Sequence, residues 1–121
     1  MDLPASQKKA YSESQLDKET EKQLKRGRAI RAVMGQMQYR LMSAETQIAV
    51  FMATNTGLLD NVSEDKILSA QEVIDITLHR HFETVVDAIV NKREKIDTKT
   101  QEKMLRAFKT ALEQEGIIVE Q

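Results

Sequence analysis

The sequence predicts an all-α fold, a bundle of about five to six short helices joined by short connections. Apolar residues recur at helical spacing in several segments, and no segment shows sustained strand-like alternation. One proline, four glycines and an aromatic content of 4% are too few for an all-β sandwich or barrel. The 121 residues correspond to one domain, and the absence of cysteine excludes disulfides and thiolate metal sites.

The first part of the sequence predicts a polar lead-in followed by a long apolar stripe. Residues 1–15 show no helical or strand periodicity, so we expect a loosely ordered or weakly helical lead-in, with residues 16–121 forming a single helical domain. Asp17 is the expected cap of the first helix. Gly27 lies within the stripe, and because glycine costs about 1 kcal/mol inside a helix, we expect it to permit close contact with another backbone. The stripe consists of Leu24, Gly27, Ile30, Ala32, Val33, Met34 and Met37.

The second helix is expected over residues 44–54, after Ser43 as its cap. Residues 48–53 are all apolar, which is typical of a helix buried on every side, and we therefore place Phe51 in the core. A buried strand is the competing interpretation of this run. Gly57 is suited to the left-handed conformation that commonly ends a helix.

The third helix is expected to begin at Ser63, with Val62 and Ile67 forming a hydrophobic staple across its first turn. Residues 79–81 interrupt the pattern, and residues 92–95 form a charged turn. The helix between these two breaks has one apolar face, which consists of Phe82, Val85, Val86, Ile89 and Val90.

The last helix is predicted to start at Ile96 and Asp97 and to end at Gly116. A short apolar tail follows at residues 117–119. The helix has one apolar face, which consists of Met104, Leu105, Phe108, Ala111 and Leu112.

The charges are unevenly distributed although the net charge is only -1. Residues 1–31 hold eight lysines and arginines against five acids, and the remainder holds ten against fourteen. The sequence has neither a strongly basic domain nor a known nucleic-acid recognition motif. We therefore interpret the basic stretch as a solvated helix face and predict no nucleic-acid partner. No apolar run approaches the roughly 20 residues of a membrane span, so we predict no membrane insertion. The amino terminus shows no targeting signal.

The sequence offers little that resembles a catalytic site. Its isolated glycines cannot form a phosphate loop, and no strand–turn–helix elbow supports a nucleophile. Asp75, His79 and Glu83 share one helix face and could chelate a cation, although such sets usually lie on solvated faces. Six methionines could form an adaptable groove but more commonly fill a core. We therefore predict no enzymatic activity, no cofactor and no metal site.

Residues 16–121 resemble the carboxyl-terminal helical domain of the alpha subunit of F-type ATP synthase. The resemblance rests on an ordered set of short segments rather than on one decisive motif. The segments are LDKET (16–20), QL (23–24), RG (26–27), QY (38–39), ETQIAV (45–50), GLLD (57–60), SED (63–65) and a final helix near residues 100–112.

The resemblance implies a non-catalytic structural domain in the ring of alpha and beta subunits that surrounds the rotating gamma stalk. The segment LDNVSED (59–65) also resembles the acidic loop of the beta subunit that touches the rotor. The resemblance thus implies candidate rotor-facing residues, unless Ser63 and the acids only cap a helix: Asp60, Asn61, Ser63, Glu64 and Asp65. For Asp60 and Asn61 we expect no structural role. It also implies a domain that is soluble when isolated and peripheral, in the complex, on the bacterial cytoplasmic face or an organelle energy-transducing membrane.

Two features depart from the family pattern. Met37 stands where the family commonly has proline, and residues 41–43 contain no proline. We therefore expect the helices to end less sharply there or to run on. The front segment is short and polar, and no nucleotide-binding domain precedes it, which favours an excised or re-engineered domain. The alternative functions are a free-standing helical adaptor unrelated to the synthase, which binds a partner helix, and a small metal hydrolase built on His79.

Overall fold

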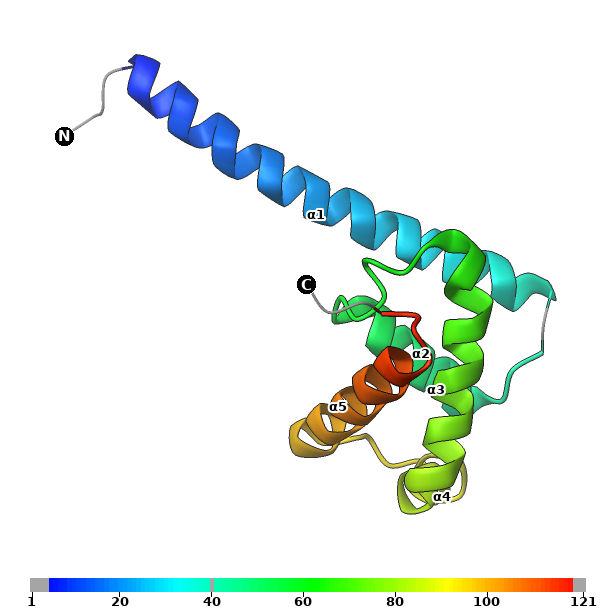
Figure 1. Cartoon of the computed structure of the whole chain (residues 1–121). Helices are drawn as coiled ribbons and strands as arrows, with labels where there is room; N and C mark the ends of the chain where they lie inside the picture. Colours follow the sequence, from blue (N-terminus) through cyan, green and yellow to red (C-terminus); the bar gives the residue numbers. More distant parts are fainter. Residues whose placement is uncertain (1–4, 40, 119–121) are drawn as a thin grey trace.

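The fold is a helical bundle from which one long helix extends (Figure 1). The computed structural model describes the backbone of residues 5–39 and 41–118, and the side chains of residues 16–38 and 41–118. No strand occurs within these ranges, so the predicted all-α class is confirmed. The helices, including one short 3₁₀ turn, are α1 (Ala5–Tyr39), α2 (Ala44–Asn55), η1 (Glu64–Lys66), α3 (Ile67–His81), α4 (Glu83–Val90) and α5 (Thr98–Gln114).

Helix α3 is the centre of the bundle and packs against α1, α2, α4 and α5. Its core-facing residues follow the three- and four-residue spacing of a helix that is in contact along its whole length. Phe108 of α5 is fully buried and meets Phe82 edge to face, with 6.2 Å between ring centroids. The residues of α3 and α5 that are buried in the core are Ile67, Ala70, Gln71, Ile74, Thr77, Leu78, Met104, Phe108 and Leu112.

Helix α1 is a single continuous helix of 35 residues, about 50 Å long at 1.5 Å per residue. The predicted start at Asp17 is wrong, because Asp17 lies inside this helix. This part of α1 is rich in residues of high helix propensity, and oppositely charged side chains one turn apart attract each other, as Glu21 and Lys25 do at 3.6 Å. The helix can therefore continue without an apolar face. Residues 16–24 are all exposed, and α1 joins the core only from Ala29 onwards. Residues 1–4 of the predicted lead-in lie outside the described residues.

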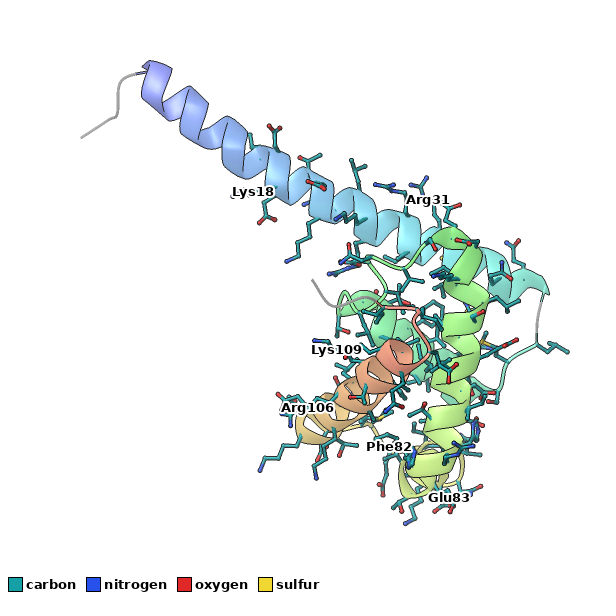
Figure 2. All side chains as sticks on the ribbon, in the orientation of Figure 1. Lys18, Arg31, Phe82, Glu83, Arg106 and Lys109 are labelled. Carbon is teal, nitrogen blue, oxygen red and sulfur yellow. The ribbon has the colours of Figure 1, made fainter. Side chains whose placement is uncertain are left out.

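Gly27 does not make the close backbone contact expected from the sequence. A Cβ atom built at Gly27 would meet nothing within 4 Å. The contact was inferred from the cost of glycine in a helix, and the structure supplies no compensating packing for that cost. The basic stretch around it is divided: Lys18 and Arg31, marked on α1 in Figure 2, are exposed, whereas Lys25 and Arg26 contact the loop after α2.

Helix α2 is buried on one side only. Ala49, Val50 and Ala53 are in the core, but Phe51 is 37% exposed and Ile48 is 43% exposed. The placement of Phe51 in the core is therefore wrong, and so is the expectation of a helix buried on every side. A run of apolar residues determines how apolar a helix is, but the number of neighbouring helices determines how much of it is covered. Here α1, α3 and α4 are the helices that pack against α2.

The helix ends largely follow the predicted signals. Gly57 has φ +92° and Gly116 φ +71°, and each follows a helix end closed by backbone hydrogen bonds. The Asp97 carboxylate accepts a hydrogen bond from the Thr100 amide at 2.8 Å, which caps α5. Although residues 41–43 contain no proline, the backbone is not helical there, and Ser43 precedes α2 in an extended conformation. Val119 of the predicted tail lies outside the described residues.

Candidate functional site

The candidate loop, residues 56–66, connects α2 to α3 and packs beside α1. Leu59 and Val62 anchor it in the core, with 0% and 8% exposure, while Asn61, Glu64 and Asp65 are exposed. Backbone hydrogen bonds from Asp60 to Gly57 and from Val62 to Leu59 make the loop a series of tight turns. The loop therefore presents its acids from a fixed backbone.

Arg26 of α1 clamps this loop. Its Nε donates to Asp60 Oδ1 at 2.9 Å and its Nη2 to Asp60 Oδ2 at 3.3 Å. Its Nη1 donates to the carbonyl of Asn55, the last residue of α2, at 2.8 Å. The guanidinium fork thus binds a carboxylate and also compensates the negative end of a helix. The carboxylate of Asp60 raises the pKa of Arg26 through this hydrogen bond.

Two expectations for the loop residues are corrected by these contacts. We expected Asp60 and Asn61 to have no structural role, yet Asp60 pairs with Arg26, and Asn61 Oδ1 accepts a hydrogen bond from Lys25 Nζ at 3.2 Å. Their partners lie in α1, more than thirty residues earlier in the sequence, and no local pattern signals them. Asn61 and the acids Glu64 and Asp65 are exposed, whereas the Asp60 side chain is only 11% exposed.

Ser63 has the extended backbone of a helix cap, but its hydroxyl makes no capping hydrogen bond. It bonds the carboxylate of Asp65 instead, and this bond, with the Asp65 backbone amide, lowers the pKa of Asp65. The predicted cap hydrogen bond is therefore wrong, because a 3₁₀ turn over Glu64–Lys66 starts the helix, with the Lys66 amide bonded to the Ser63 carbonyl at 2.9 Å. Val62 and Ile67, the predicted staple, are both buried in the core.

We expect the Arg26–Asp60 pair to contribute measurable coupling energy. A double-mutant cycle of Arg26→Ala and Asp60→Ala should give about 1–2 kcal/mol in urea unfolding, because the pair is bidentate and partly buried. The exposed Glu21–Lys25 pair is the control and should give less than about 0.5 kcal/mol. Equal coupling in the two cycles would show that Arg26 is not a clamp.

His79 connects α3 to the start of α2. Its Nδ1 lies 2.9 Å from the Asp75 carbonyl oxygen and 3.1 Å from Asp75 Oδ1, and its Nε2 lies 3.1 Å from Glu45 Oε1. Thr46 of α2 donates to Asp75 Oδ1 at 2.6 Å, which adds a second link between the helices. Of the three residues with cation-binding spacing, the structure joins Asp75 and His79, but the third partner is Glu45 rather than Glu83.

The surroundings of His79 shift two pKa values in opposite directions. The hydrogen bond to the Asp75 carbonyl, and then the one to Glu45, raises the pKa of His79 above 6.5. Burial alone would raise the pKa of Glu45, but hydrogen bonds from its own amide, from His79 and from Ser43 outweigh burial and lower it below 4.5. The imidazolium–carboxylate pair is therefore favoured in the folded state.

The stability of the fold should depend on pH through this pair. A raised histidine pKa stabilises the fold fully below about 6.5, and this contribution is lost as pH rises through the folded value. The lowered pKa of Glu45 stabilises the fold above about pH 4.5, and this contribution is lost as the pH falls through the folded value. Between pH 6 and 9, the free energy of unfolding measured in urea should decrease. The decrease should be absent in His79→Gln and still present in His81→Gln, the control. Since His79 is half-exposed, the loss should be below about 1 kcal/mol. An unchanged slope in His79→Gln would contradict this role.

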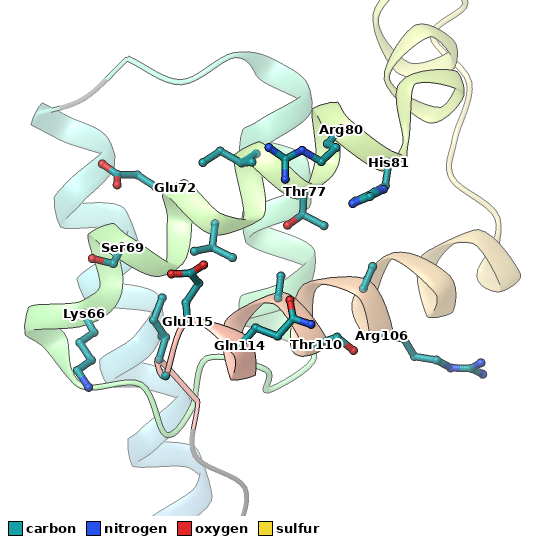
Figure 3. A pocket seen from close by; sticks show the side chains of 16 residues that line it. Lys66, Ser69, Glu72, Thr77, Arg80, His81, Arg106, Thr110, Gln114 and Glu115 are labelled. Atoms are coloured by element: carbon teal, nitrogen blue, oxygen red, sulfur yellow. The ribbon is translucent and has the colours of Figure 1, made fainter.

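A hollow with a volume of about 940 Å³ lies between α3 and α5 (Figure 3). Arg80 and His81 stand at the carboxyl end of α3, and Arg106 extends from α5 away from them in the figure. Lys66, Glu72 and Glu115 lie towards the other end. Its polar groups do not converge on a common point, so it does not have the geometry of a catalytic site.

Neither a metal-binding cluster nor a membrane-spanning helix occurs in the described part of the molecule. Within residues 16–38 and 41–118, no three histidine, aspartate or glutamate side chains are placed to hold one metal ion. At His79 the reason is geometric, since its two ring nitrogens face two different carboxylates. None of the helices over residues 5–39 and 41–118 combines the length and apolar character that a bilayer crossing requires.

The family model for the carboxyl-terminal domain of the ATP synthase alpha/beta subunits matches residues 9–111. The protein belongs to this family. The match includes the candidate loop, the Arg26 clamp and the His79 network, so these features are elements of an alpha/beta carboxyl-terminal domain. An adaptor unrelated to the synthase finds no support in the comparisons.

Several similar curated proteins are alpha subunits of ATP synthase. The sequence is 34% identical over 111 residues to ATP synthase subunit alpha of Dehalococcoides mccartyi strain BAV1, which covers 90% of this chain and 21% of that protein. It is 40% identical over 79 residues to the alpha subunit of Xylella fastidiosa strain 9a5c, which covers 65% of this chain and 15% of that protein. It is 30% identical over 99 residues to ATP synthase subunit alpha 2 of Syntrophus aciditrophicus, which covers 82% of this chain and 19% of that protein. The chain thus spans about a fifth or less of these relatives, and no solved structure matches it.

Proposed function

We propose that this protein acts as the carboxyl-terminal structural domain of an F-type ATP synthase alpha subunit. In this role it contributes to the ring of alpha and beta subunits around the gamma stalk during proton-driven ATP synthesis. The observation that carries the proposal is the family match over residues 9–111, together with the 34% identity to an alpha subunit over 90% of the sequence.

The loop of residues 56–66 is the proposed rotor-facing element. Its support is physical: the backbone is fixed by Leu59, Val62 and the Arg26 clamp, while Glu64 and Asp65 remain exposed. A surface that meets a moving partner benefits from a rigid base, because a flexible loop would absorb the displacement. Asp60 has a positioning role in this proposal, whereas Asn61, Ser63, Glu64 and Asp65 form the face towards the rotor.

The proposed domain has no catalytic role of its own. Its four glycines are separated in the sequence and form no phosphate loop, so we expect calorimetric titration with Mg-ATP to show no binding. Beta and gamma subunits are the proposed partners, and the proposed location is peripheral, on the bacterial cytoplasmic face or an organelle energy-transducing membrane. The division into a lead-in of residues 1–15 and a domain of residues 16–121 stays a prediction.

A chimeric subunit tests the proposal. The protein replaces the corresponding carboxyl-terminal segment of the Xylella fastidiosa alpha subunit, and the chimera is mixed with the beta and gamma subunits of that organism. We expect an assembled ring on size-exclusion chromatography, and ATP hydrolysis with rotation of gamma. Failure of this chimera to assemble, when the unmodified alpha subunit assembles, would contradict the proposed function.

The loop is then tested within the assembled ring. Glu64→Gln with Asp65→Asn should leave assembly unchanged and alter rotation rate or torque modestly, because both carboxylates are exposed. Glu102→Gln, an exposed acid on α5, is the matched control and should leave rotation unaltered. If the loop variant rotates like the control, the loop is a turn without a rotor contact, and the structural role in the ring still stands.

A further inference from the structure

The outward face of α2 is more apolar than an exposed helix face usually is. Ile48 and Phe51 lie on it with 43% and 37% exposure, and Met52 is half-buried beside them. Apolar side chains that cluster on one exposed face, rather than lying scattered, are typical of a surface that binds a ligand or another protein.

Ile48 and Met52 form one wall of a groove between α2, α4 and the segment before α5. The groove has a volume of about 550 Å³, within the range of ligand-binding clefts. Ile89 of α4 and Ile96 line it as well, so that aliphatic side chains from three segments converge. Asn55, Thr56 and Gln101 add polar groups to its lining.

The segment between α4 and α5 forms a basic rim beside this groove. Glu94 and Lys95 line the groove, and Lys92 and Arg93 precede them on the exposed loop. Residues 91–97 thus hold three cations and two anions, because Asp97, which caps α5, also belongs to this segment. Arg93 has φ +54°, the left-handed conformation that a residue with a side chain seldom adopts, and the Glu94 amide bonds the Ala88 carbonyl at 3.0 Å. This local geometry holds the basic side chains on a fixed turn.

We propose that this groove binds an amphipathic helix of another polypeptide, with aliphatic side chains in the groove and acidic residues facing Lys92, Arg93 and Lys95. The apolar walls supply the contact area, and the excess of cations on the rim selects the charge of the partner. The described residues contain no strand, so no sheet edge is available there for an extended peptide.

The larger hollow between α3 and α5 is a weaker candidate. Its exposed aliphatic side chain is Ile76, and its other lining is largely small or polar, including Ser69, Ala107 and Thr110. It therefore serves as the internal control. The proposal does not depend on assembly into a synthase ring, because it concerns the surface of this protein alone.

A designed peptide tests the groove directly in the full-length protein. The probe is a synthetic helical peptide of about 18 residues with leucine on one face and glutamate on the other. Methyl groups of isoleucine are labelled for NMR, and the peptide is titrated at low salt. We expect signals of Ile48, Ile89 and Ile96 to shift and that of Ile76 to stay in place. The same peptide with lysine in place of glutamate should bind at least about fivefold more weakly.

Variants separate the groove from other surfaces. Ile48→Gln should weaken binding of the acidic peptide about tenfold, whereas Ile76→Gln, a matched change at an exposed isoleucine, should leave it unchanged. Lys92→Glu with Lys95→Glu should remove the preference for the acidic peptide. Both positions are exposed, so these variants are expected to fold.

Several outcomes would overturn the proposal. They are shifts confined to Ile76, equal binding of the two peptides, or no shift at about 1 mM peptide. Shifts at Ile48 and Ile89 that depend on the protein concentration without peptide would identify a second copy as the occupant instead. Each of these outcomes is independent of whether the chimeric subunit assembles.

Discussion

Phe108→Ala is expected to destabilise the protein by about 3–5 kcal/mol, a large part of the stability of a domain of this size. Phe108 is fully buried between α5 and the central helix α3, and its ring meets Phe82 edge to face. Truncation removes the buried ring and leaves a cavity that helices packed on several sides cannot readily fill. Urea unfolding followed by circular dichroism measures the change.

Phe51→Ala provides the matched control, since the same atoms are removed from a side chain that is 37% exposed. We expect a smaller loss of about 1–2 kcal/mol, because part of the ring is already exposed to solvent and its removal leaves no closed cavity. Equal losses at the two positions would show that the outward face of α2 is covered in solution, for example by a second copy of the protein.

Gly57→Ala is expected to destabilise by about 1–3 kcal/mol. The φ of +92° disfavours any residue with a Cβ atom, and a Cβ there would lie 2.7 Å from Arg26 Nη2 and 3.2 Å from Asp60 Oδ2. The substitution therefore strains the end of α2 and displaces the clamp at the same time. Thermal unfolding should show a clear decrease in Tm.

Gly27→Ala should have the opposite effect and stabilise by about 0.5–1 kcal/mol. Gly27 lies inside α1, where alanine is the better helix former, and a Cβ atom would meet nothing within 4 Å. A destabilised Gly27→Ala variant would show a close contact at this position that the structure lacks. The pair of substitutions thus distinguishes a glycine required by its backbone from one that is not.

The loop acids illustrate how far a candidate site can be predicted. The sequence predicted a loop between two helices, because GLLD and SED combine a helix end with a helix start, and the candidate rotor-facing residues were chosen from the resemblance alone. It did not identify Arg26, which lies 34 positions before Asp60 and belongs to a different helix. His79 and Glu45 are likewise separated by 34 positions, so their pairing had no signal in local spacing.

The sequence by itself determined the helical class, the family and several helix ends, including those at Gly57, Asp97 and Gly116. These features depend on propensities and hydrogen bonds within a few residues, so the local pattern contains the cause. The tertiary structure alone decided that one face of α2 is exposed, that Arg26 clamps the candidate loop and that no neighbouring helix lies within 4 Å of a Cβ atom built at Gly27. Such features depend on which helices lie side by side, and the packing of the whole molecule around α3 decides this.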